Sequence, residues 1–165
     1  EDKYKFEYHK KIELGKAEII QEGKDLTIIA IGKTVAKATK IASEIEKHEF
    51  ESGQISVEVI NARFLKPLDE ETIKSSILKT KNVITIEDGT IINGLSTAIK
   101  ELIVEEKLEG INLKNYAYTD KFIEHGSVKK KKKRYKIDEE TIIDDFIRRK
   151  DGQTTNFKRI QKTRW

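Results

Sequence analysis

Cysteine and methionine are both absent from this chain, and proline occurs only once. Without cysteine the chain cannot form a disulfide, present a thiolate nucleophile, or ligate zinc or an iron–sulfur cluster through sulfur. Because translation begins at methionine and residue 1 is a glutamate, we expect a processed product or a piece of a longer polypeptide. Part of the function is then expected to lie outside these 165 residues.

Long hydrophobic runs and arginine are also scarce. No apolar run approaches the roughly 20 residues that span a bilayer, and no signal peptide is visible, so we expect neither membrane association nor secretion. Charged residues make up 38% of the chain and hydrophobic residues 36%, which predicts a polar surface around the modest core of one domain. Most of the 33 basic residues are lysines, which suit solvation better than phosphate binding.

Hydrophobic periodicity predicts strands and helices that alternate along the chain. Apolar runs typical of strands buried on both faces lie at residues 26–31, 55–60 and 82–86, followed by a more polar strand at 111–118. Apolar stripes at helical spacing lie at residues 34–48, 69–78, 95–103 and 138–147. This alternation predicts a three-layer α/β fold with a doubly wound, mostly parallel sheet. Residues 17–20 are expected to add one antiparallel edge strand.

Composition divides the chain into three parts. Residues 1–11 are charged and predict a linker. Residues 12–149 contain all the periodic segments and predict one domain. Residues 150–165 show no periodicity and predict a basic, disordered tail.

The tripeptide Gly32-Lys33-Thr34 follows a strand and begins a helix, which is where a phosphate-binding loop would lie. Such a loop needs a glycine five positions before Gly32, and Thr27 stands there, inside the strand. The favoured interpretation is a tight turn that Gly32 permits.

The tripeptide Glu87-Asp88-Gly89 follows the third buried strand, at the end where α/β folds bind ligands. Together with Asn115 it faintly imitates a thiamine diphosphate motif, in which aspartate and asparagine hold magnesium. That motif begins with glycine, whereas this chain has Glu87, and Asn115 is expected within a strand. We therefore favour a turn with polar groups that cap a helix over a metal site.

Two further features could carry chemistry. His125 has an acid and a hydroxyl beside it in sequence, but a catalytic triad needs groups that converge in space, so a solvated loop histidine is favoured. The six cations Lys129–Arg134 could attract nucleic acid or another anion. Only Tyr135 is adjacent to stack on bases, and the net charge is only +4, so nucleic-acid binding is not favoured.

Four segments form a familiar combination: residues 15–32, Asn61–Asp69, Glu87–Ala98 and Asp120–Gly126. Together they resemble the C-terminal domain of 1-deoxy-D-xylulose-5-phosphate synthase, a family of the transketolase superfamily, over roughly residues 12–149. The Arg-Phe-x-Lys-Pro-Leu-Asp and Phe-x-Glu-His-Gly stretches favour this synthase over two alternatives, transketolase and the 2-oxoacid dehydrogenase β subunit. An independent basic module that binds nucleic acid or another anion is a further alternative.

The resemblance implies a transketolase C-terminal-domain-like fold and a structural, dimerising role within a larger homodimeric transferase. The whole enzyme condenses pyruvate with glyceraldehyde 3-phosphate, at the start of the methylerythritol phosphate route to isoprenoids. Thiamine diphosphate and Mg²⁺ supply the chemistry and in this family are held by two preceding domains. We therefore expect no catalytic, cofactor-binding or metal-ligating residue in this chain. The bacterial cytoplasm or a plastid-type organelle is the expected compartment.

Residues at the strand ends are expected to face the preceding domains of the same polypeptide or the second subunit. The candidates are Asn61, Arg63, Lys66, Asp88, Gly89, Gly94 and His125. The chain departs from the family in the loop after the third strand, where paired glycines become Asn93-Gly94.

Overall fold

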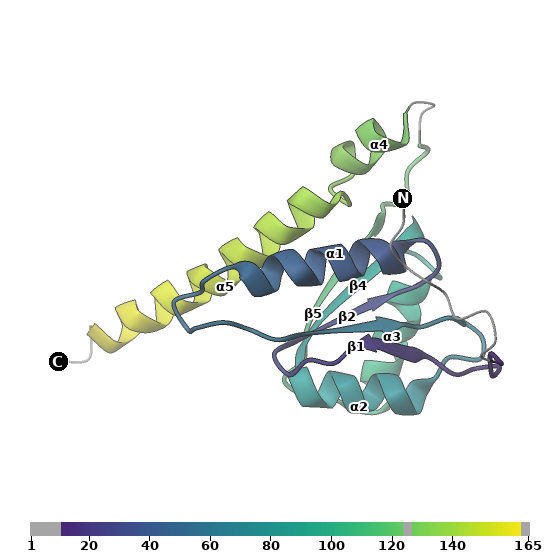
Figure 1. Cartoon of the computed structure of the whole chain (residues 1–165), viewed down its shortest axis with the longest axis horizontal. Helices are drawn as coiled ribbons and strands as arrows, with labels where there is room; N and C mark the ends of the chain where they lie inside the picture. The colour runs from purple at the N-terminus through teal and green to yellow at the C-terminus, as the bar shows by residue number, and fades with distance from the viewer. Residues whose placement is uncertain (1–10, 124–126, 163–165) are drawn as a thin grey trace.

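The structure is a computed structural model that describes residues 11–123 and 127–162 (Figure 1). Its strands are β1 (Glu18–Gln21), β2 (Leu26–Ala30), β3 (Val57–Asn61), β4 (Asn82–Thr90) and β5 (Asn112–Tyr118). Its helices are α1 (Thr34–Lys47), α2 (Glu70–Thr80), α3 (Leu95–Glu105), α4 (Val128–Arg134) and α5 (Glu139–Lys162). In these residues no helix combines the length and apolar character needed to cross a membrane.

The strands form one mixed sheet in the order β1-β3-β2-β4-β5. Strands β2 to β5 pair in parallel, whereas β1 pairs antiparallel with β3 at one edge. Helices α1 and α5 lie on one face of the sheet, and α2 and α3 lie on the other (Figure 1). The expected three-layer α/β fold with one antiparallel edge strand is therefore confirmed.

The sheet separates two hydrophobic clusters. Every residue of β2 is buried, as the continuous apolar run predicts for a central parallel strand. Neighbouring side chains of a strand point to opposite faces, so Ile28 packs beneath α1 and α5, and Ile29 packs beneath α2 and α3. Helix α5 contributes Ile142 and Phe146 to the first cluster, which makes the start of α5 part of the core.

Aspartates begin two of the helices. The Asp69 carboxylate accepts hydrogen bonds from the backbone N–H and the hydroxyl of Thr72 and so caps α2. Asp138 accepts the equivalent pair of hydrogen bonds from Thr141 at the start of α5. These caps satisfy backbone groups that have no partner within the helix.

Two segments differ from expectation, and a third, whose secondary structure the sequence left open, is helical. Strand β4 continues through Glu87-Asp88-Gly89 to Thr90, so the turn expected there is wrong. The lysine-rich run forms α4, because lysine and arginine have high helix propensity and the Ser127 hydroxyl caps the first turn. Helix α5 passes residue 150 and continues to Lys162, since no proline or cap ends it there. The expected domain bounds stay a prediction.

Candidate interface at the carboxyl edge of the sheet

The carboxyl ends of β2 and β4 meet at the point where the chain changes direction across the sheet. From β2 the chain crosses to β3 on one side, and from β3 it returns over β2 to β4 on the other. Ligand sites of open α/β sheets lie at such switch points, outside the carboxyl ends of the strands. The site is therefore built from the loops that follow β2, β3 and β4.

The loop after β2 is a tight turn, as expected. Gly32 has a φ of 61°, in the left-handed region that glycine tolerates best. The Thr34 hydroxyl donates to the carbonyl oxygen of Ile86 at 2.8 Å, which ties the start of α1 to β4. The Thr34 hydroxyl is used inside the fold, so the loop lacks the metal-facing hydroxyl of a phosphate-binding loop.

Lys33 and Asp88 form an ion pair across the switch point. Burial alone would raise the pKa of the Asp88 carboxyl, but the hydrogen bond and the charge of Lys33 outweigh it and hold the pKa below its usual value. A carboxylate with a lowered pKa is a weak proton acceptor near neutral pH. Because the Lys33 side chain is 74% exposed, solvent screens the pair and it adds little to stability.

Other titratable groups surround this pair. Lys37 of α1 is buried, and its ammonium group donates to the carbonyl oxygen of Ile137 at 2.7 Å. Burial lowers the pKa of Lys37, and the positive charge of Lys132 on α4 lowers it further. Burial and the charge of Asp88 raise the pKa of the Tyr118 hydroxyl. The surroundings of Asp88 are thus predominantly cationic.

Glu87 is buried and caps α3 from within the neighbouring strand. Its two carboxylate oxygens accept hydrogen bonds from the N–H groups of Leu95 and Ser96, each at 2.9 Å, and from the Ser96 hydroxyl at 2.6 Å. A Cβ atom on Gly94 would lie 2.0 Å from Glu87 Oε2. Gly94 is therefore needed for this cap, a role inside the domain. The capping part of the sequence interpretation is confirmed.

The loop after β3 holds a second group of expected interface residues. The Asn61 side-chain oxygen accepts the N–H of Arg63 at 3.0 Å, and Arg63 has a φ of 55°. The Arg63 guanidinium pairs with Glu18 of β1 at 2.5 Å. Lys66 is exposed. Asn61 and Lys33 line the same depression of about 210 Å³, so the loops after β2 and β3 are brought together.

The remaining expected residues form a separate group or lie outside the structure. Gly89 of β4 and Gly94 before α3 both lie beside Glu87. Asp88 also lies in β4, but its side chain meets Lys33 of the loop after β2. Gly89 could accept a Cβ atom at 3.6 Å from Glu87 Oε2. His125 lies outside the described residues.

The side chains at this edge do not fit a magnesium–pyrophosphate site. Both oxygens of Glu87 hold α3, and Asp88 is paired with Lys33. Asn115 accepts the Thr85 hydroxyl at 2.6 Å, on the face of the sheet that carries α3. Nowhere in residues 11–123 and 127–162 do three potential metal ligands gather. The expectation that the cofactor and metal are held elsewhere stays a prediction.

Sequence reasoning missed three partners at this edge. Nothing in the sequence indicated that Lys33 would meet Asp88, since the parallel pairing of β2 with β4 brings them together. Lys37 is buried although it is charged, and its ammonium group donates to Ile137 in the segment that joins α4 to α5. The contact between Glu87 and Gly94 could have been suspected from the sequence, because a glycine just before a helix permits a close approach of another group.

The fold and this edge define a three-layer α/β domain with a mostly parallel sheet, and comparison with known proteins identifies its family. The family model of the transketolase C-terminal domain matches residues 15–142. The chain therefore belongs to the transketolase C-terminal domain family, as the sequence resemblance predicted.

Similar curated proteins include two synthases of the same name. The chain is 40% identical over 118 residues to the 1-deoxy-D-xylulose-5-phosphate synthase of Desulfotalea psychrophila, covering 72% of this chain and 18% of the relative. It is 38% identical over 136 residues to the synthase of Caldanaerobacter subterraneus subsp. tengcongensis, covering 82% of this chain and 21% of the relative. The chain thus spans about a fifth of the length of these relatives.

A solved structure shares the fold. It is described as a split gene transketolase, inactive beta4 tetramer, and it superposes with a TM-score of 0.75 at 28% sequence identity. The match covers 89% of this chain and 46% of the other. Most of the described fold is therefore that of a transketolase domain.

Proposed function

We propose that this chain is the C-terminal structural domain of a 1-deoxy-D-xylulose-5-phosphate synthase and supplies no catalytic group itself. The observation that carries the proposal is that relatives of this name match the chain along about a fifth of their length. The polar groups at the carboxyl edge support it, because Glu87, Asp88 and Thr34 are engaged within the domain. The alternatives of transketolase and a dehydrogenase β subunit receive less support from the relatives' names.

The activity proposed for the whole polypeptide is the one that the relatives' name describes. It would be a transferase that condenses pyruvate with glyceraldehyde 3-phosphate and feeds isoprenoid synthesis. Thiamine diphosphate and Mg²⁺ would be bound by preceding domains, and the complete enzyme would be a homodimer in a bacterial cytoplasm or a plastid-type organelle.

The loops at the carboxyl edge would face those preceding domains. Ile92, after β4, is 46% exposed, and Phe122, after β5, is 92% exposed. Large apolar side chains exposed on loops are typical of surfaces that another protein surface covers. Asn61, Arg63 and Lys66 would add polar contacts along the same edge.

Product analysis tests the proposed activity. The polypeptide that contains this chain is incubated with pyruvate, glyceraldehyde 3-phosphate, thiamine diphosphate and Mg²⁺, and the sugar phosphate is identified by mass spectrometry. We expect 1-deoxy-D-xylulose 5-phosphate and carbon dioxide from that polypeptide and no product from the isolated chain. Ketol transfer between sugar phosphates without pyruvate would identify a transketolase instead. Decarboxylation of pyruvate by the isolated chain would contradict the structural role.

A further inference from the structure

Strand β5 is an edge of the sheet with an open outer side. Within the described residues it pairs with β4 alone. The N–H of Asn112 donates to Lys81, and the carbonyl of Tyr118 accepts from Ile91, so alternate residues from Asn112 onward direct their backbone groups toward β4. The backbone groups of Leu113 and Asn115 therefore point outward, and in the described chain no backbone hydrogen bond meets them.

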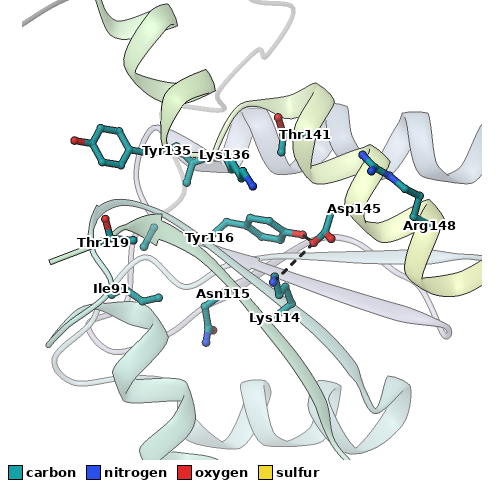
Figure 2. Close-up of a pocket in the computed structure, with 12 residues that line it drawn as sticks. Ile91, Lys114, Asn115, Tyr116, Thr119, Tyr135, Lys136, Thr141, Asp145 and Arg148 are labelled. Carbon is teal, nitrogen blue, oxygen red and sulfur yellow. Dashed lines mark hydrogen bonds and ion pairs between the residues drawn. The ribbon is translucent and has the colours of Figure 1, made fainter. Parts of the chain in front are cut away.

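A groove of about 450 Å³ runs between this strand and the segment that joins α4 to α5 (Figure 2). Lys114, Asn115 and Tyr116 line one wall, and Lys136, Thr141 and Arg148 are among the residues that line the other. Asn112 and Lys114 are exposed, whereas Tyr116 and Ala117 are buried. On this side the lining of the groove begins at Lys114 and extends past the end of β5 to Thr119.

Cations predominate in this groove. Three of its lining residues are basic, Lys114, Lys136 and Arg148, and one is acidic, Asp145. The Asp145 carboxylate accepts the hydroxyl hydrogen of Tyr116 and lies 4.0 Å from Lys114 Nζ (Figure 2). It also lies 3.5 Å from Arg149 Nε. Its negative charge is already met by neighbours, so the groove keeps a positive surplus.

We propose that an extended segment of a partner protein, rich in acidic side chains, binds this groove by adding a strand to β5. A free strand edge beside a helix is a recurring geometry for capturing extended peptides. The outward groups of Leu113 and Asn115 supply main-chain hydrogen bonds, and the lysines and arginine select acidic side chains. Pairing with a second copy through the same edge would bring two cationic grooves together, which like-charge repulsion opposes.

The proposal stands on the geometry of β5 and is independent of the activity of the whole polypeptide. Its probe is a hexapeptide of alternating glutamate and valine, titrated into the ¹⁵N-labelled chain. We expect the amide resonances of Leu113 and Asn115 to shift and to become protected from hydrogen exchange. A matched peptide N-methylated at alternate amides keeps the charge but cannot pair as a strand, and it should bind at least about tenfold more weakly.

Variants of the chain separate the two sources of affinity. Leu113→Pro removes an outward N–H, which edge strands tolerate, and should weaken peptide binding about tenfold. The double variant Lys136→Gln/Arg148→Gln should weaken it similarly, whereas Lys100→Gln on the exposed side of α3 should leave it unchanged. Should Leu113→Pro fail to fold, the N-methylated peptide still decides the matter.

Two results would overturn the proposal. One is equal binding of the normal and N-methylated peptides. The other is binding of polyphosphate that matches the peptide's affinity and shifts only the amides of α4, which would identify a general polyanion surface.

Discussion

At the scale of single residues, Glu87 and Gly94 depend on each other. The buried carboxylate replaces solvent for the free N–H groups at the start of α3, and a negative charge there also interacts favourably with the helix dipole. It can do so only because residue 94 has no side chain, since a Cβ atom would lie 2.0 Å from one oxygen. A small residue thus permits a strong cap.

Gly94→Ala is therefore expected to destabilise the domain by about 2 kcal/mol or more, because the Glu87 carboxylate must move away from α3. Chemical denaturation followed by circular dichroism measures the loss. Gly152→Ala is the matched control, since Gly152 lies in α5 with nothing within 4 Å of an added Cβ. It should stabilise the chain by about 0.5–1 kcal/mol through helix propensity. Equal effects of both changes would refute the role given to Gly94.

Asp69 links stability to pH. Burial would raise the pKa of its carboxyl, but hydrogen bonds from Ala17 and Thr72 and the charge of Lys16 outweigh it and lower the pKa below 3.8. Because the pKa is lower in the folded state than in the unfolded state, the contribution is fully present above the unfolded value and is lost as the pH falls through the folded value.

Asp69→Ala should consequently cost about 1–2 kcal/mol at neutral pH. The difference from the unaltered chain should shrink when unfolding is measured at falling pH, below the usual carboxyl pKa of 3.8. Asp144→Ala, at an exposed position of α5, provides a control that should change little. A cost for Asp69→Ala that stays constant down to the acid unfolding transition would contradict the assignment.

At the scale of elements, the sequence predicted those strands and helices whose apolar residues are buried at regular spacing. Strand β2 and helices α1 and α3 were recognised because their apolar residues follow the period of the element. The end of β4 was not, since Glu87-Asp88-Gly89 has the composition of a turn. Glu87 can be buried there because N–H groups at the start of α3 donate hydrogen bonds to its carboxylate. Contacts such as Lys33 with Asp88 come from sheet register, which one sequence does not reveal.

A substitution in α5 tests whether this helix is part of the core. Phe146 is 8% exposed and packs edge-on against Phe50, with ring centres 6.0 Å apart. Phe146→Ala should lower the free energy of unfolding by about 3–5 kcal/mol. Phe122→Ala, which alters a ring that is 92% exposed, should change it by less than about 0.5 kcal/mol in the isolated chain. If both substitutions have small effects, α5 does not belong to the core.

At the scale of the whole molecule, the domain is a three-layer α/β fold. Polar side chains such as Glu87, Asp88 and Thr34 make their contacts within the domain. Basic side chains gather at two places. Around Asp88, Lys33 pairs with the carboxylate and Lys37 donates to a carbonyl oxygen, whereas in the groove along β5 basic residues outnumber acidic ones. The family, which the sequence motifs indicated, explains the first place as the edge expected to face other domains. The second is a separate surface at the far strand.

The most direct test of the account is a chimera. Residues 12–149 of this chain would replace the matched segment of the Caldanaerobacter synthase, and formation of 1-deoxy-D-xylulose 5-phosphate would be measured from pyruvate and glyceraldehyde 3-phosphate. The account predicts that the chimera recovers activity well above that of the same synthase without the segment. A folded, soluble chimera no more active than the truncated synthase would contradict it.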